Sequence, residues 1–223
     1  MSTEQLFDSR VARHPARFSD ALLPILIEAL RGATKVLDPF AGTGRIHEIA
    51  LALGIESVGI ELEPEWAACH PRTQVGNALD LPFADGFFDA ICTSPTYGNR
   101  MADHHEAHDD SRRNTYRHAL GRPLSSDNSG AMQWGEKYRD FHRQAWAEAV
   151  RVLARGGRFV CNISDHIRDF QQVPVSEWHH ETLEELGLVL VADHHVPTPR
   201  NRFGENAEAR VEYEHVYILM CGP

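Results

Sequence analysis

The sequence predicts an α/β protein with a Rossmann-like, doubly wound fold: a mostly parallel seven-stranded sheet that ends in an antiparallel C-terminal hairpin. Short apolar and β-branched runs alternate with helical patterns along most of the chain. A glycine-containing turn, "AGTG" at 41–44, joins the first of these runs to the helix that follows. The last two runs have no helix between them, so one of these strands must run antiparallel.

Each element follows from its local pattern. The first is a helix over 18–32, because Ser19 suits the N-cap, apolar residues recur at helical spacing and Gly32 ends it. The remaining elements are predicted as a strand at 35–40, a helix at 45–53, a strand at 57–62, a short helix at 63–69, a strand and loop at 73–83, a strand at 87–94, a long helix at 138–157, a strand at 158–164, a helix at 175–187, and strands at 188–196 and 211–221.

Length and composition predict a single domain over 1–223. The chain has 223 residues and 42% hydrophobic content, enough for one sizeable core. About 98–132 and 197–210 fit no element, and the first is predicted to be a long inserted loop. Four scattered cysteines favour neither disulfides nor a zinc knuckle and suit a reducing, cytoplasmic setting. No apolar stretch is long enough to span a membrane. The oligomeric state is not predicted.

Charge leaves two interpretations open. A net charge of −10 counts against a general nucleic-acid coat, but not against a locally basic cleft. The two unassigned stretches mix arginines with acidic residues, which fits either a charge-balanced surface or phosphate and base contacts beside a ligand crevice. The arginines singled out for substrate contact are Arg100, Arg112, Arg113, Arg200 and Arg202.

Histidines gather in one stretch, but they do not carry a prediction. His104, His105 and His108 are of a type that binds transition metals. No second cluster at fixed spacing accompanies them, and the pairs at 179–180 and 194–195 carry less weight still. The sequence therefore predicts no metal site.

The glycine turn marks a candidate ligand site, because ligands of open α/β sheets bind at the carboxyl ends of the strands. A P-loop needs Lys and Ser or Thr after its last glycine, and Arg45 and Ile46 follow Gly44. A dinucleotide fingerprint needs a third glycine where His47 stands. Glu61 nevertheless ends the second strand, where an acidic residue binds a ribose diol.

A ligand with an adenosine ribose, an amino-acid end and no phosphates fits these facts, and S-adenosylmethionine is such a ligand. Asp38 would face its amine, the amides of Gly42 and the helix start its carboxylate, and Glu61 its ribose. Asn77 would bind the adenine edge beside the backbone of Ala78. Each acidic or amide side chain alone is equally well explained as a strand-end cap, but three at successive strand ends favour a binding site.

Four motifs occur in a characteristic order: "DPFAGTG" at 38–44, "ELEP" at 61–64, "GNALDLPF" at 76–83 and "TSPTYG" at 93–98. With them the chain resembles the class I S-adenosylmethionine-dependent amino-methyltransferases, in particular small DNA N4-cytosine/N6-adenine methyltransferases such as those carried by phages. The resemblance covers about 13–220. It implies that Phe40, Ala41, Gly42 and Gly44 bind S-adenosylmethionine and that DNA is the partner.

In that family the fourth strand ends in Asp/Asn/Ser-Pro-Pro-Tyr/Phe, and the matching residues here are Ser94, Pro95, Thr96 and Tyr97. An exocyclic amine becomes nucleophilic only when acceptors draw its hydrogens out of conjugation with the base. The resemblance assigns that role to the Ser94 hydroxyl and the Pro95 carbonyl. Tyr97 would stack on a base taken out of the duplex. Thr96 replaces the second proline, so we expect a less rigid, substrate-contacting loop.

The resulting hypothesis is methyl transfer from S-adenosylmethionine to an exocyclic amine of a DNA base, cytosine N4, because Ser94 begins the motif. Two enzymatic alternatives stay open: adenine N6 in DNA and an amine of an RNA base. A third is a catalytically inactive cofactor-binding subunit, which the departure at Thr96 favours.

Overall fold

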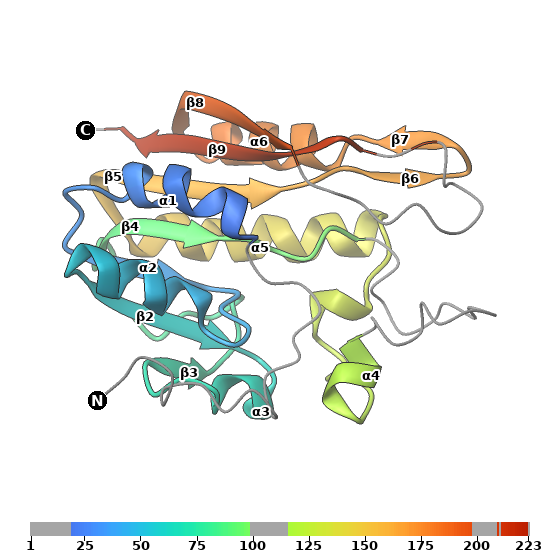
Figure 1. The fold of residues 1–223 in the computed structure, drawn as a ribbon, viewed down its shortest axis with the longest axis horizontal. Helices are drawn as coiled ribbons and strands as arrows, with labels where there is room; N and C mark the ends of the chain where they lie inside the picture. The colour runs from blue at the N-terminus through green and yellow to red at the C-terminus, as the bar shows by residue number, and fades with distance from the viewer. Residues whose placement is uncertain (1–18, 99–115, 198–208, 210, 223) are drawn as a thin grey trace.

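The computed structural model describes residues 19–98, 116–197, 209 and 211–222. A seven-stranded sheet of order β3-β2-β1-β4-β5-β9-β8 forms the centre of the molecule (Figure 1). Neighbours from β3 to β5 pair in parallel, and β9 runs antiparallel to both β5 and β8, which confirms the predicted fold class. The strands are β1 (Lys35–Asp38), β2 (Glu56–Glu61), β3 (Thr73–Val75), β4 (Phe88–Thr93), β5 (Leu153–Ile163), β8 (Leu188–Pro197) and β9 (Tyr213–Cys221).

Helices cover both faces of the sheet. In Figure 1, α1 (Leu23–Ala29) and α2 (Arg45–Leu53) lie in front, and α5 (Glu136–Val152) and α6 (Val175–Glu185) lie behind. Two clusters of buried apolar side chains fill the two interfaces. Because both faces are covered, the middle residues of the central strands β1 and β4 are apolar and buried, namely Val36, Leu37, Ala90, Ile91 and Cys92. The short helices are η2 (Asp20–Leu22), α3 (Pro64–Ala67), α4 (Tyr116–Leu120) and η4 (Ser129–Ala131).

Several boundaries differ from the sequence prediction. The long helix ends at Val152, and the "LARGG" segment predicted to continue it already belongs to β5, where Leu153 pairs with Phe88. The third strand keeps only three of the predicted residues. The prediction that 98–132 contains no element is wrong for the part described from 116 onward, because α4 and η4 lie there. Residues 99–115 and nearly all of 198–210 lie outside the described part of the chain.

A small hairpin, unexpected from the sequence, projects beyond the carboxyl ends of the parallel strands (Figure 1). It consists of β6 (His166–Arg168) and β7 (Gln171–Val173). Its two-residue turn holds Asp169 and Phe170 at φ 49° and 60°. Two-residue turns are ordinarily recognised by Asn-Gly or Asp-Gly, but the two turn residues here are Asp and Phe. None of the helices in the described ranges is long and apolar enough to cross a membrane.

The turn between β1 and α2 requires glycine at position 44. Gly44 has φ +88°, and a Cβ there would lie 2.8 Å from Cδ2 of His47 and 2.9 Å from Cβ of His70. The His47 ring fills the space below the turn, with Nδ1 2.9 Å from Ser57 Oγ and Nε2 2.9 Å from Thr73 Oγ1. His47, which stands where a dinucleotide fingerprint has its third glycine, thus joins α2 to β2 and β3 by hydrogen bonds.

Gly44→Ala should lower the free energy of unfolding by about 2–4 kcal/mol, because a left-handed backbone costs about 1 kcal/mol and crowding adds to it. Gly32→Ala is the matched control: Gly32 has φ +84°, but no atom lies within 4 Å of the position that a Cβ would take. We expect it to lose only about 1 kcal/mol. Urea unfolding followed by circular dichroism measures both. Equal losses would show that the histidines move aside without cost.

Candidate active site

Two buried carboxyl groups and a hydroxyl meet where β1, β2 and β4 end. Asp38 ends β1 and is 3% exposed. Its Oδ1 accepts hydrogen bonds from Thr93 Oγ1 of β4 at 2.7 Å and from the Phe40 N–H at 3.0 Å. Burial raises the pKa of Asp38 to about 7, against the opposing effect of these two hydrogen bonds. Asp38 therefore lies at the switch point between β1 and β4, where open α/β sheets bind ligands.

Glu61 links the glycine turn to the end of β2. Its Oε2 accepts the Gly42 N–H at 2.9 Å and its Oε1 accepts the Glu63 N–H at 2.8 Å. Burial raises the pKa of Glu61 to about 7, the two backbone hydrogen bonds lower it, and the charges of Glu63 and Asp38 add to the rise. A carboxylate offers about four lone-pair positions, so two remain for another donor.

The other predicted cofactor residues follow β1 and β3 in the chain. The Ala41 N–H donates to the Ile60 carbonyl at 2.9 Å, which fixes the turn against β2. The Phe40 ring packs edge-on against Trp146 of α5, with centroids 5.7 Å apart. Asn77 follows β3, and its Oδ1 accepts the Leu79 N–H at 3.0 Å, so its amide N–H groups face no partner within that turn. The next residue, Ala78, is buried.

The motif after β4 is held by a polar chain that crosses three strands. Asn162 of β5 donates through Nδ2 to the Tyr97 hydroxyl at 3.1 Å and to Glu214 Oε2 of β9 at 2.9 Å. The Tyr97 hydroxyl lies 3.1 Å from Ser94 Oγ. The phenol oxygen accepts from Asn162 and shares a hydrogen bond with Ser94 in which either hydroxyl can donate. Pro95 between them is buried.

Asn162 and Glu214 were absent from the sequence-based candidates. They are 1% and 7% exposed and stand as polar residues inside the apolar runs of β5 and β9. A buried polar side chain inside a strand needs a partner, and that is the signal that points to them.

Thr96, which stands where the family has a second proline, forms hydrogen bonds through both its side chain and its main chain. Its Oγ1 donates to Ser129 Oγ at 2.9 Å, and its carbonyl accepts the Tyr138 O–H. The Tyr138 hydroxyl lies 2.8 Å from His179 Nε2, and Trp146 donates its indole N–H to His179 Nδ1 at 2.8 Å. His179 therefore carries its hydrogen on Nε2. Burial lowers the pKa of His179, which keeps the chain neutral.

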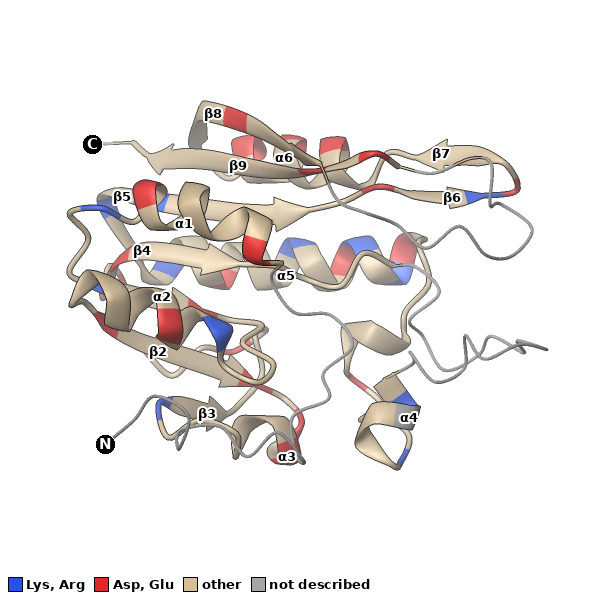
Figure 2. Ribbon diagram, in the orientation of Figure 1, with Lys and Arg blue, Asp and Glu red and all other residues tan. Residues whose placement is uncertain are grey.

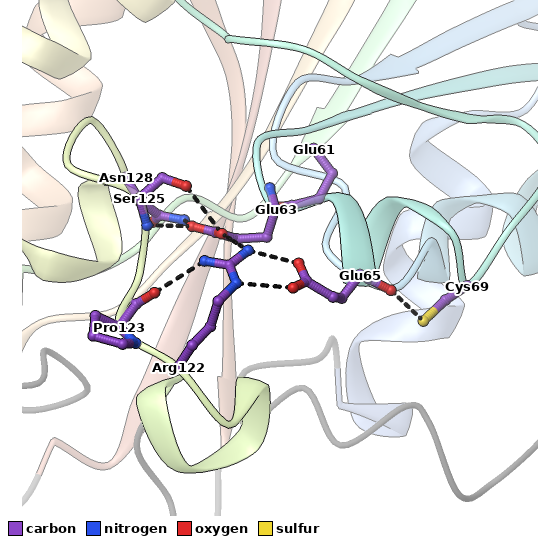
Figure 3. Close-up of polar contacts among 8 residues, drawn as sticks. All are labelled: Glu61, Glu63, Glu65, Cys69, Arg122, Pro123, Ser125 and Asn128. Carbon is purple, nitrogen blue, oxygen red and sulfur yellow. Dashed lines mark hydrogen bonds and ion pairs between the residues drawn. The ribbon is translucent and has the colours of Figure 1, made fainter.

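Glu63 fixes the segment that supplies Ser129 (Figure 3). Its fully buried carboxylate accepts the Ser125 N–H at 2.8 Å, Asn128 Nδ2 at 2.8 Å and Arg122 Nη2 at 2.7 Å. Arg122 also forms a two-pronged pair with Glu65, at 2.8 and 2.6 Å. Burial opposes ionisation of Glu63, but these hydrogen bonds prevail and lower its pKa. Arg122, one of the arginines in the stretch 98–132, thus forms ion pairs with two carboxylates.

The arginines predicted for substrate contact are not placed by the structure. Arg100, Arg112, Arg113, Arg200 and Arg202 lie outside the described residues, as does the histidine stretch at 104–108. Within the described part, the basic residues of α5 are interspersed with acidic ones (Figure 2).

Comparison with protein families identifies the chain. A profile described as DNA methylase matches residues 2–69 and 88–223, and one described as methyltransferase domain matches residues 37–114. The chain belongs to the DNA methylase family and is a class I S-adenosylmethionine-dependent methyltransferase with S-adenosylmethionine as its cofactor. No curated protein matches it in sequence.

Solved structures share the fold at low identity. A geranyl diphosphate C-methyltransferase from Streptomyces coelicolor A3(2) is 14% identical, with 97% of this chain and 89% of that chain covered and a TM-score of 0.58. An S-adenosylmethionine-dependent methyltransferase from Methanosarcina mazei is 12% identical, with 89% and 97% covered and a TM-score of 0.56. The [4+2]-cyclase SpnF is 14% identical, with 91% and 81% covered and a TM-score of 0.57. At these identities the likeness establishes the fold and not the reaction.

The raised pKa of Asp38 predicts a pH dependence of stability. Its folded-state value of about 7 lies above the ordinary 3.8, so its contribution is complete below the ordinary value and is lost as the pH rises through about 7. The stability of the wild type relative to Asp38→Asn should fall by about 1–3 kcal/mol from about pH 5 to about pH 8. Urea unfolding of both proteins measures the difference, in which the histidines cancel. A constant difference would contradict the raised pKa.

The different burial of the two acids that bind Arg122 predicts different costs. Glu63→Gln turns an amide N–H₂ toward buried donors and should lower the free energy of unfolding by about 2 kcal/mol. Glu65→Gln, at a side chain that is 48% exposed, should cost less than about 1 kcal/mol. Urea unfolding compares them, and a larger loss for Glu65→Gln would show that the exposed pair holds the segment.

Proposed function

We propose that the protein transfers a methyl group from S-adenosylmethionine to an exocyclic amine of a DNA base, cytosine N4. One observation carries the proposal: in a chain of the DNA methylase family, the Ser94–Tyr97 segment begins directly after Thr93, whose hydroxyl bonds Asp38 at the switch point. The hydrogen bond from Thr93 to Asp38 thus links the strand that leads into the predicted amine-binding motif to the predicted cofactor-binding residues.

The proposal assigns each part of the S-adenosylmethionine molecule to residues at or just after the end of a strand. Asp38 binds the amine, and Glu61 accepts from the ribose hydroxyls with its remaining lone pairs. The carboxylate binds at the start of α2 after the turn, because the Gly42 and Gly44 N–H groups already donate to Glu61 and Ala41. Asn77 and Ala78 bind the adenine. Structures of the same fold hold S-adenosyl-L-homocysteine or sinefungin, which supports this placement.

Transfer requires that the base amine be turned toward the methyl group in line with the bond that breaks. Ser94 Oγ and the Pro95 carbonyl accept the two amine hydrogens and so release the nitrogen lone pair. The chain from Asn162 through Tyr97 positions the Ser94 hydroxyl. The proposal has Tyr97 donate to Ser94, so that the Ser94 hydrogen is available to the neighbouring ring nitrogen of cytosine. A carboxylate in place of Ser94 would only accept. The preference for cytosine rests on the motif itself, because a leading serine resembles the cytosine N4 branch of the family.

The base must leave the duplex to reach this position. The proposal gives Tyr97 two roles, a ring that stacks on the base and a hydroxyl that orients Ser94. Thr96 lies beside the base, held by Ser129 and Tyr138. The predicted DNA-contacting arginines follow the Ser94–Tyr97 motif in the chain, three at 100–113 and two at 200–202.

The test is to incubate the protein with S-adenosylmethionine carrying a labelled methyl group and with unmethylated DNA or RNA, followed by mass spectrometry of the nucleosides. The proposal expects label in N4-methylcytosine from DNA. Label only in N6-methyladenine, or only in RNA, would overturn the cytosine or the DNA assignment. Cofactor binding without transfer to either polymer would identify an inactive cofactor-binding subunit.

Variants separate the roles of the site residues. Ser94→Ala should abolish transfer and leave S-adenosylmethionine affinity unchanged, whereas Asp38→Asn should weaken that affinity. Tyr97→Phe keeps the ring and removes the hydroxyl, so transfer should fall on the order of 10- to 100-fold through loss of alignment. Tyr97→Ala should lose more if the ring stacks on the base. Equal losses for the two Tyr97 variants would exclude the stacking role.

A further inference from the structure

Three side chains of metal-binding type converge where the β8–β9 ladder opens toward the carboxyl ends of the parallel strands. His195 of β8 pairs directly with His215 of β9. Asp193 lies two residues before His195 and therefore on the same face of the sheet. One ligand atom from each of the three side chains lies within 4.8 Å of the other two.

The distances suit an ion without rearrangement of the backbone. His195 Nε2 lies 3.0 Å from Asp193 Oδ2, and His215 Nδ1 lies 3.0 and 3.1 Å from the two carboxylate oxygens. Neighbouring ligand atoms around a tetrahedral zinc ion lie about 3.3–3.4 Å apart, because metal–ligand distances are about 2.0–2.1 Å. The two histidine–carboxylate distances are a few tenths of an ångström, roughly, below that spacing, and the two histidine nitrogens lie within 4.8 Å of each other.

Both imidazoles are braced in the orientation that a metal needs. The His195 ring stacks on Tyr213, with centroids 4.4 Å apart and planes 10° apart. The His215 ring stacks on Tyr217 at 5.1 Å and 19°. A ligand that is already fixed loses little conformational freedom on binding, which favours a site over a chance encounter of surface side chains.

We propose that Asp193, His195 and His215 form a binding site for a divalent transition-metal ion, with zinc as the ion whose ligand preference they match. Two imidazole nitrogens and one carboxylate oxygen make a three-ligand set that leaves a fourth position open to water. The site is shallow, since the His195 side chain is 51% exposed. The sequence did not predict this site, because the two histidines are brought together by strand pairing and not by a short motif.

The position of the site ties it to the acceptor segment. Glu214, the residue before His215, points to the opposite face of β9 and binds Asn162, which holds Tyr97. An ion at His215 would fix the beginning of β9 and, with it, the support of Glu214. The inference concerns metal binding itself and does not depend on the methylated substrate.

The experiment uses the full, untagged chain, freed of metal with a chelator and titrated with Zn²⁺ by calorimetry and with Co²⁺ by visible absorption. We expect about one ion per chain, a Co²⁺ spectrum of nitrogen and oxygen ligation, and a rise in melting temperature, because an ion that binds the folded state stabilises it. His195→Ala should lower the Zn²⁺ affinity at least about 10- to 100-fold. Loss of a residue that merely hydrogen-bonds a metal ligand already has an effect of that size, and His195 is itself a proposed ligand.

His194→Ala is the matched control, because His194 is an exposed neighbour that projects to the other face of β8. It should bind as the wild type does. His215→Ala and Asp193→Asn should resemble His195→Ala, and unchanged circular dichroism and S-adenosylmethionine affinity would show that they fold. Unchanged Zn²⁺ affinity and stoichiometry in His195→Ala would overturn the proposal. So would loss of binding in a His104→Ala, His108→Ala double variant alone, which would place the ion elsewhere.

Discussion

The buried carboxylate of Glu61 is the contact on which the carboxyl edge of the sheet depends. It accepts two backbone N–H groups, one from the glycine turn after β1 and one from the chain after β2. A buried backbone N–H without a partner costs free energy. The hydrogen bonds to Glu61 therefore fix the positions of the Gly42 turn and of the chain at Glu63 relative to the end of the sheet. The glycine turn can meet Glu61 only because Gly42 and Gly44 adopt positive φ. The same carboxylate keeps lone pairs for a ligand, so support and recognition share one side chain.

The proposed cofactor side and the proposed acceptor side of the site are joined by one segment. Glu63, just after β2, binds Asn128, and the next residue, Ser129, accepts from Thr96 after β4. Thr96 thus replaces a proline and is still held in place: its hydroxyl donates to Ser129, and its main-chain carbonyl accepts from the Tyr138 hydroxyl. The same fold also occurs in a [4+2]-cyclase, so these particular side chains, and not the sheet, support the proposal of amine methylation.

Strand β9 serves two sites because its side chains alternate between the faces of the sheet. Glu214 turns inward to Asn162, and His215 turns to Asp193 on the other face. His179 and His195 show how little histidine pairs in a sequence reveal by themselves. His179 is a buried hydrogen-bond relay of α6, whereas His195 is an exposed member of the metal-type cluster. Burial, and not residue type, separates the two.

By itself the sequence determined the alternation of strands and helices, the glycine turn, and the order of the motifs that contain Asp38, Glu61 and Ser94, because each depends on neighbours within a few positions. Tertiary structure alone decided which side chains support them. Asn162 and Tyr97 are 65 positions apart, and Glu63 and Asn128 are also 65 apart. The five-residue α4 is too short to be stable in isolation, so only packing against the folded chain selects it. Contacts of this kind form when the sheet brings distant strand ends to one edge, and no local pattern records which residues will meet there.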